Sequence, residues 1–234
     1  MRQVLTIFQK EFKDYFVSPI AYIVISIFLL VTGWFFLMTF FLYNQAELRN
    51  FFTLLPFTFS FVIPAVTMRL FAEEMSVGSY ETLLTLPVTE TDIILGKFLA
   101  AATFVAAMLL PTLSYPIFIS FIGDLDWGPV IGGYLGAILL GAGYCAIGLF
   151  ASALTRNQII AFIIGMVICF TLTLIDQMLF FVPRNILSVI AYIGAGHHFQ
   201  NIAKGIIDTR DVLYFLSVMV IGLFGTNLVM QEKK

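Results

Sequence analysis

The chain has 234 residues, of which 60% are hydrophobic and only 11% are charged, and its formal net charge at pH 7 is −2. A soluble domain usually carries about 25% charged residues, and a water-exposed surface could not accommodate so much apolar side chain. The composition therefore excludes an ordinary soluble protein, and the small net charge gives no sign of nucleic acid as a partner. We predict an all-α, polytopic membrane protein with one domain, residues 1–234.

Residues 1–17 are predicted to form an amphipathic helix that lies in the cytoplasmic membrane interface with its apolar face toward lipid. At 100° per residue the lysines lie opposite an apolar arc, whereas Ile7 and Glu11 fall outside the pattern. The arc consists of Val4, Leu5, Phe8, Phe12, Tyr15 and Phe16. Ser18-Pro19 then turns the chain, since proline suits the first turn of a helix. This helix is an anchor or a contact for a partner, and the pattern leaves both open.

Six apolar runs are long enough to cross a bilayer as helices, which takes about 20 residues each. They do not alternate as the strands of a membrane barrel do. The runs are 20–42, 51–68, 98–122, 130–154, 159–181 and 212–230. A further stretch, Asn185–Gly196, is too short to span. Together with the rest of an extracytoplasmic segment, 182–211, it is predicted to be re-entrant or interfacial before the last span.

An even number of spans places both termini on the same side of the membrane. Cytoplasmic loops carry an excess of Lys and Arg, and most of the 12 basic residues fall on the side of the termini. That side has Arg2, Lys10, Lys13, Arg69, Lys97, Arg156, Lys233 and Lys234, against Arg49, Arg184, Lys204 and Arg210 on the other. We therefore predict that both termini are cytoplasmic.

The segment 69–97, between the second and third spans, is cytoplasmic in this orientation and is rich in acids and helix breaks. Gly78 ends the helix that continues from the second span, and Ser79 can cap a short helix that Pro87 ends. Thr89 with Asp92 three residues on is a capping-box pattern that opens the next helix. A short surface helix held between two spans is suited to receiving a force from a cytoplasmic partner.

This segment resembles the coupling-helix region of type-two ABC exporter permeases. The resemblance rests on Glu74, Gly78-Ser79, Glu81, Leu83-Leu84, Pro87-Val88-Thr89, Ile93 and Gly96-Lys97. It departs at Met75, where a basic residue often follows the acid, and at Tyr80, which replaces the more usual leucine. The run Gly194–Phe215 resembles the segment before the last span in the same family, with His198-Phe199, Gly205, Asp208 and Arg210-Asp211.

Three shorter runs are similar to the permease subunit of the gliding-motility-associated ABC transporter. They are residues 18–22, 63–69 and 151–158. Gliding itself does not follow, because such permeases are not restricted to organisms that glide.

The resemblance implies a permease subunit of the inner (cytoplasmic) membrane that pairs with a second permease, identical or homologous. Each subunit would dock one cytoplasmic ABC ATPase, which binds ATP and Mg, and an extracytoplasmic accessory protein is a further expected partner. Membrane lipid would surround the spans. The expected ATPase-coupling residues are Glu73, Glu74, Gly78, Ser79, Glu81, Thr82, Leu83, Pro87, Thr89, Asp92, Gly96 and Lys97. The expected extracytoplasmic gate is His198, Phe199, Gly205 and Asp208.

The chain itself has no phosphate-binding loop, since Gly96-Lys97 is followed by Phe98. No cofactor and no catalytic residues are expected on it, so it is predicted not to be an enzyme. His197 and His198 are adjacent, and on a helix they point about 100° apart, so we expect no metal site. Asp176 is an ionisable residue inside a span, where it is either functional or paired with a polar neighbour; we favour the pairing.

In the fourth span, Gly133, Ala137, Gly141 and Cys145 recur every four residues, and we expect this small-residue face to pack within the chain. Two other functions stay open beside the exporter. One is a membrane scaffold that relays ATPase motion to an extracytoplasmic partner without moving solute. The other is an ion-coupled secondary transporter that uses Asp176.

Overall fold

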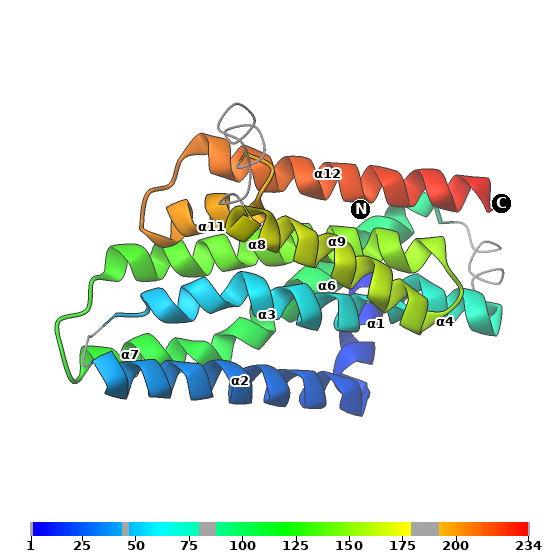
Figure 1. Cartoon of the computed structure of the whole chain (residues 1–234). Helices are drawn as coiled ribbons and strands as arrows, with labels where there is room; N and C mark the ends of the chain where they lie inside the picture. Colours follow the sequence, from blue (N-terminus) through cyan, green and yellow to red (C-terminus); the bar gives the residue numbers. More distant parts are fainter. Residues whose placement is uncertain (1, 44–46, 80–87, 179–191, 234) are drawn as a thin grey trace.

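The structure is a computed structural model that describes residues 2–43, 47–79, 88–178 and 192–233 (Figure 1). Within these residues every regular element is helical. The helices are α1 (Arg2–Val17), α2 (Pro19–Tyr43), α3 (Arg49–Thr67), α4 (Arg69–Val77), α6 (Glu90–Leu109), the 3₁₀ helix Leu110–Leu113, α7 (Ser114–Ser120), α8 (Trp127–Leu154), α9 (Gln158–Met178), α11 (Ala195–Ala203) and α12 (Thr209–Glu232). The all-α prediction is confirmed.

In the described part of the chain, six helical stretches are long and apolar enough to cross a membrane, as predicted. They are Pro19–Leu42, Arg49–Val77, Glu90–Ser120, Trp127–Leu154, Gln158–Ile175 and Thr209–Glu232. The second and third are longer than their apolar runs, because helix continues into the charged segments on either side of residues 80–87.

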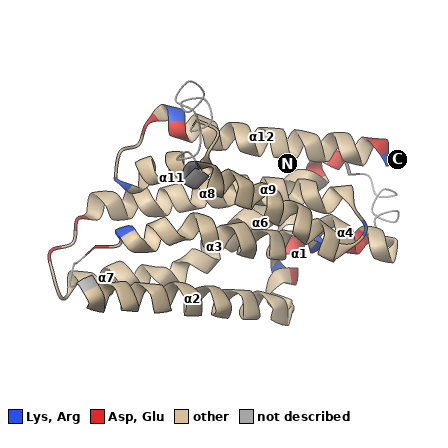
Figure 2. Cartoon of the chain, viewed as in Figure 1, with Lys and Arg blue, Asp and Glu red and all other residues tan. Residues whose placement is uncertain are grey.

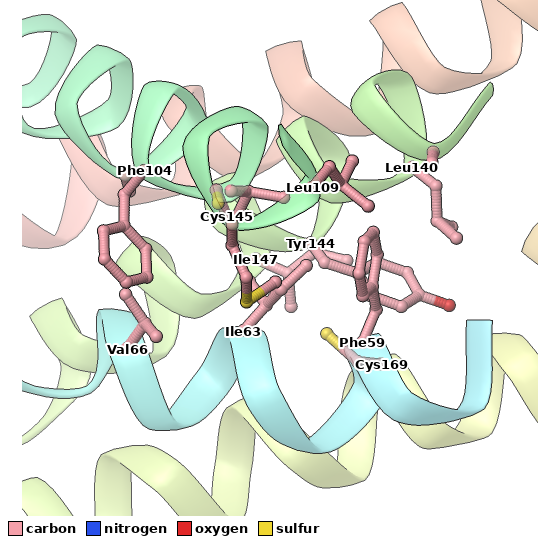
Figure 3. Close-up of a cluster of buried hydrophobic side chains, with 14 of the residues drawn as sticks. Phe59, Ile63, Val66, Phe104, Leu109, Leu140, Tyr144, Cys145, Ile147 and Cys169 are labelled. Atoms are coloured by element: carbon pink, nitrogen blue, oxygen red, sulfur yellow. The ribbon is translucent and has the colours of Figure 1, made fainter. Parts of the chain in front are cut away.

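The long helix α8 lies at the centre of the bundle and packs against α3, α6, α9, α11 and α12. Its glycines allow this, since a Cβ at Gly133 would meet the Phe52 ring at 2.3 Å and one at Gly141 would meet Val105 at 2.7 Å. The small-residue face therefore packs within the chain, as expected. Figure 3 shows part of the resulting core, where α3 and α8 side chains such as Phe59 and Tyr144 meet.

Three helices on the outside of the bundle carry largely exposed apolar side chains: α2, α9 and α12. Leu30 on α2 is 72% exposed and Ile221 on α12 is 70% exposed. Charged residues gather at the two ends of the bundle, and the helices between are almost free of them (Figure 2). An apolar outer surface with polar ends is what a bilayer requires of a protein, so this is a multi-pass membrane protein.

The two ends of the bundle differ in what they contain (Figure 1). One end holds α1, α4, the start of α6 and the C-terminus of α12, and we call it the coupling end. The other holds the turn 121–126, helix α11 and the turn 204–208, and we call it the distal end. Helix α11 belongs to the predicted extracytoplasmic segment; it packs on α8, while residues 182–191 of that segment lie outside the described residues.

Candidate functional site

Lys97 is the centre of a buried polar cluster at the coupling end. Its Nζ donates to Glu74 Oε1 at 2.7 Å, to the Leu70 carbonyl at 2.8 Å and to Glu11 Oε1 at 3.1 Å. Lys97 belongs to α6, and its ammonium donates all three of its hydrogen bonds to acceptors on α1 and α4. Its side chain is 1% exposed. One cation therefore joins the three helices that adjoin the predicted coupling segment.

The two carboxylates of this cluster are nearly as buried as the lysine. The side chains of Glu11 and Glu74 are 11% and 16% exposed. Removing one partner from a buried ion pair leaves an uncompensated charge, which typically costs about 3–5 kcal/mol. Glu74 Oε2 is buried and has no hydrogen-bond partner among the described residues. Removing the lysine alone would therefore leave two buried carboxylates without a cation.

Helix α1 packs closely on α6 at a glycine. A Cβ built on Gly96 would lie 2.7 Å from Ile7 Cγ2 and 3.2 Å from the Val4 carbonyl oxygen. Ile7 and Glu11, which fall outside the apolar arc, thus face α6.

The apolar arc was predicted to face lipid, but part of it faces the bundle, since Tyr15 is buried and its ring stacks on Phe104 of α6. Glu11 lies on the same side because Lys97 neutralises its carboxylate.

The break between α3 and α4 at Met68 is fastened to α8 by Ser152. The Ser152 hydroxyl accepts from the backbone N–H of Phe71 and of Ala72, both at 3.0 Å, and donates to the Met68 carbonyl at 2.7 Å. The hydroxyl therefore provides hydrogen-bond partners for backbone groups that lose their helical partners at the break. Sequence reasoning missed Ser152, which lies 84 residues from Met68 in the chain.

A hollow of about 540 Å³ opens between α1 and α4 at the coupling end. On its wall the Arg69 guanidinium lies 5.2 Å from the centre of the Tyr15 ring and donates to Ser18 Oγ at 3.3 Å. Burial raises the pKa of the Tyr15 phenol well above its usual value, so the hydroxyl stays protonated and donates to the Val66 carbonyl at 3.4 Å. Acidic side chains reach the same hollow: Glu11, Asp14, Glu73 and Glu74.

The predicted helix break at Gly78 and the predicted capping box are confirmed. Gly78 has φ +79°, a left-handed conformation that glycine adopts without strain, and it ends α4. Thr89 Oγ1 accepts from the Asp92 backbone N–H at the start of α6, and the Asp92 carboxylate accepts from the Thr89 N–H. The Ser79 hydroxyl donates to the Glu74 carbonyl at 3.3 Å, and the short helix that Ser79 is predicted to cap lies outside the described residues.

The middle of the predicted coupling segment lies outside the described residues. This applies to Glu81, Thr82, Leu83 and Pro87. Of the described coupling residues, the structure brings Glu74 and Lys97 together, and it leaves Glu73 exposed on α4.

At the distal end, His198 is buried and bonded through both ring nitrogens. Nδ1 lies 2.5 Å from Asp211 Oδ1 and Nε2 lies 3.0 Å from the Tyr192 carbonyl oxygen. The ring also stacks on Tyr214, with centroids 4.1 Å apart. Asp211, on α12, is the acid that binds His198, whereas the sequence predicted Asp208 as the acid of the gate.

The other predicted gate residues have separate surroundings. Phe199 is fully buried beneath α8, where it lies against Gly136. Gly205 has φ +85° and turns the chain over Gly128. Asp208 caps α12 by accepting from the Arg210 backbone N–H at 3.0 Å.

Within the described ranges, no three His, Cys, Asp or Glu residues are grouped to hold a metal ion. His197 is exposed, while both nitrogens of its neighbour are occupied. Asp176 lies on α9, and its side chain is outside the described part of the chain.

The site thus consists of a helix break, a capped re-entry helix and a buried ion cluster at one end of a six-span bundle. A family model described as "ABC-2 family transporter protein" matches residues 5–221, which extend from α1 into α12. No curated protein matches the chain. Since the match covers nearly all of the sequence, the chain belongs to the ABC-2 family of transporter proteins.

Proposed function

We propose that this chain is the membrane-spanning permease of an ATP-driven exporter and that it is driven by a separate cytoplasmic ABC ATPase through residues 69–97. ATP and Mg²⁺ bind the partner ATPase, and two permease chains pair in the inner membrane with their termini in the cytoplasm. Membership of the ABC-2 family supports a membrane transport subunit. The direction of transport and the docking segment are our proposal.

The observation that carries the proposal is the Lys97 cluster. It joins α1, α4 and α6 through one buried ammonium, and α4 and α6 are the helices that precede and follow residues 78–89 in the chain. A partner that pushes on this segment would move these three helices together, because separating them breaks a buried ion pair. Ser152 then transmits the displacement of α4 to α8, at the centre of the bundle. The mechanism is a rigid-body shift of packed helices.

The hollow beside the cluster supports docking at the same place, and its wall carries acids together with the basic residues Lys10, Arg69 and Lys97. Glu73 and Asp14 are exposed on its wall, and complementary charge at an interface guides association and orientation. We propose that they face basic side chains of the ATPase. Glu74 has a different role from the one its position in the motif suggests, since its carboxylate is already bound to Lys97. By binding Lys97, Glu74 holds α4 against α6 and so maintains the docking surface.

The deciding experiment compares charge reversals in the coupling segment with a charge reversal at the distal end. Glu73→Lys and Glu81→Lys should each weaken ATPase binding about tenfold and abolish the stimulation of ATP hydrolysis by the permease. Arg210→Glu, at the distal end, should leave both unchanged. Glu74→Lys is a poor test, because it would place two ammonium groups in one buried cluster. Unchanged binding and stimulation in both Glu73→Lys and Glu81→Lys would overturn the assignment.

The membership of the complex is tested first, by purifying the tagged chain from native membranes in a mild detergent. We expect a stoichiometric soluble chain with a phosphate-binding loop to accompany it. Nucleotide-dependent movement of a solute by the reconstituted complex then separates an exporter from a scaffold. The narrower assignment to a gliding-motility-associated transporter, and an accessory protein outside the membrane, stay predictions that the same purification tests.

A further inference from the structure

Two adjoining hollows lie at the distal end, far from the coupling cluster. The larger has a volume of about 240 Å³ and the smaller about 80 Å³. Both are lined by Arg49, Phe52, Ala203 and Lys204, so they form one continuous depression between the start of α3 and the end of α11. Pockets for whole drug-sized ligands measure roughly 300–1,000 Å³. Even taken together, the two hollows lie only at the bottom of this range, so the depression suits a small polar group rather than a large solute.

The walls of the depression are held in place by close backbone packing. A Cβ on Gly132 would lie 2.3 Å from the Ile202 carbonyl oxygen, and one on Gly205 would lie 3.1 Å from the Gly128 carbonyl carbon. The end of α11 and the turn after it are therefore pressed directly onto the start of α8. Such contacts fix the α8 and α11 sides of the depression relative to each other.

Charges of both signs surround an apolar floor. The cations Arg49 and Lys204 border both hollows, and no ion pair joins either of them to another described residue. Two acids, Glu47 and Asp126, border the larger hollow. One oxygen of Asp126 accepts from the Gly128 backbone N–H, which leaves its other oxygen for a ligand. The smaller hollow contains the two cations without an acid.

We infer that this depression binds the zwitterionic headgroup of a phospholipid, of the phosphoethanolamine type. Arg49 and Lys204 hold the phosphate, since charge-assisted hydrogen bonds to phosphate oxygens are strong. The ammonium enters the larger hollow toward Glu47 and Asp126. The acyl chains lie along the apolar surface of the bundle. The position fits, because Arg49 begins a spanning helix and headgroups lie where spans end.

The proposal distinguishes this headgroup from an anionic one. A site that reads only the phosphate would prefer phosphatidylglycerol, whose headgroup has a net negative charge. The two carboxylates attract the ammonium group of phosphatidylethanolamine. The headgroup of phosphatidylglycerol has no cation that could interact with them. We therefore expect phosphatidylethanolamine to bind more tightly than phosphatidylglycerol with identical acyl chains.

The test is native mass spectrometry of the full chain, delipidated in detergent and titrated with each lipid. Arg49→Gln and Lys204→Gln should each weaken phosphatidylethanolamine binding about five- to tenfold. Glu47→Gln should reduce the preference for that lipid over phosphatidylglycerol. Arg210→Gln is the matched control, an exposed cation at the same end that lines neither hollow, and it should bind as the unaltered chain does.

Thermal unfolding of each lipid-free variant confirms that it folds as the unaltered chain does. Equal binding of the two lipids, or equal losses in the Arg49, Lys204 and Arg210 variants, would overturn the inference. Because lipid binding is measured without nucleotide or ATPase, its failure leaves the exporter assignment untouched, and failure of that assignment leaves this result standing.

Discussion

The side chain of Ile7 lies against Gly96, and a Cβ added to this glycine would come within 2.7 Å of Ile7 Cγ2. Helix α1 can approach α6 this closely only because residue 96 has no side chain. The approach also brings the Glu11 carboxylate to Lys97, one residue further along α6. The glycine and the ion pair therefore act together to attach the N-terminal helix to the bundle.

Gly96→Ala should destabilise the protein by about 1–3 kcal/mol, because α1 must move outward and the Glu11–Lys97 bond lengthens. Thermal unfolding in detergent measures the loss. Gly143→Ala is the matched control, since its new Cβ would meet nothing closer than 3.5 Å. It should be neutral or stabilising by up to about 1 kcal/mol. Adding Ile7→Ala to Gly96→Ala should restore only part of the stability, since Ile7 Cβ remains 2.8 Å from the new atom.

Lys97→Met should destabilise the fold by about 3–5 kcal/mol, because Glu11 and Glu74 would then share a buried site without a cation. Limited proteolysis should cut the variant near α1 much faster than the unaltered chain. Lys10→Met removes a lysine whose side chain is 58% exposed and lies 3.5 Å from the same Glu11, so it should cost no more than about 1 kcal/mol.

A second measurement separates unpaired charge from lost hydrogen bonds at this cluster. Combining Lys97→Met with Glu11→Gln and Glu74→Gln removes all three charges, and most of the lost stability should return. If the triple variant is as unstable as Lys97→Met alone, the loss comes from the missing hydrogen bonds of the ammonium, such as that to the Leu70 carbonyl, rather than from unpaired carboxylate charge.

The features that could be predicted from the sequence are those encoded locally. The six spans follow from apolar runs. The capping box follows from Thr89 and Asp92, which are three positions apart, and the helix break at Gly78 follows from the residue type alone. Local spacing fixes such structures before any tertiary contact forms. Where an apolar run is followed by a turn, the predicted end of the span agrees closely with the end of the helix, as at Leu154.

The features that could not be predicted are contacts between distant residues. Glu11 lies 86 residues from Lys97, and Ser152 lies 84 residues from Met68. Periodicity shows which residues share a face, but not that a buried cation on another helix will neutralise a carboxylate on that face. His198 pairs with Asp211 rather than Asp208 for a similar reason: Asp208 is used as the cap of α12, and the first helical turn carries the next acid inward.

His198→Phe should leave the Asp211 carboxylate buried without a partner, and the predicted loss of stability is about 1–3 kcal/mol. Hydrogen exchange should locate the loss to α11 and the first turn of α12. His197→Phe changes the exposed neighbouring histidine and should leave exchange there unchanged. A similar effect of the two substitutions would mean that the pair does not hold this corner together.

Thr173 joins three spans through hydroxyl groups at the centre of the bundle. Its Oγ1 lies 2.6 Å from the Tyr144 hydroxyl on α8 and 2.8 Å from Ser60 Oγ on α3. Hydrogen bonds between membrane helices contribute about 0.6 kcal/mol each on average, so Thr173→Val should destabilise the protein by about 1 kcal/mol.

Thr171→Val is the control on the same helix, because its hydroxyl is exposed and donates only to the Val167 carbonyl. Both changes replace a hydroxyl with a methyl group, so helix propensity changes in the same way, while only the Thr173 hydroxyl lies between helices. Only Thr173→Val should lower the unfolding temperature in detergent. If α9 must shift relative to α3 and α8 during transport, the same variant should also change the turnover rate, whereas Thr171→Val should not. A loss of stability with unchanged turnover would limit these hydroxyls to holding the resting bundle together.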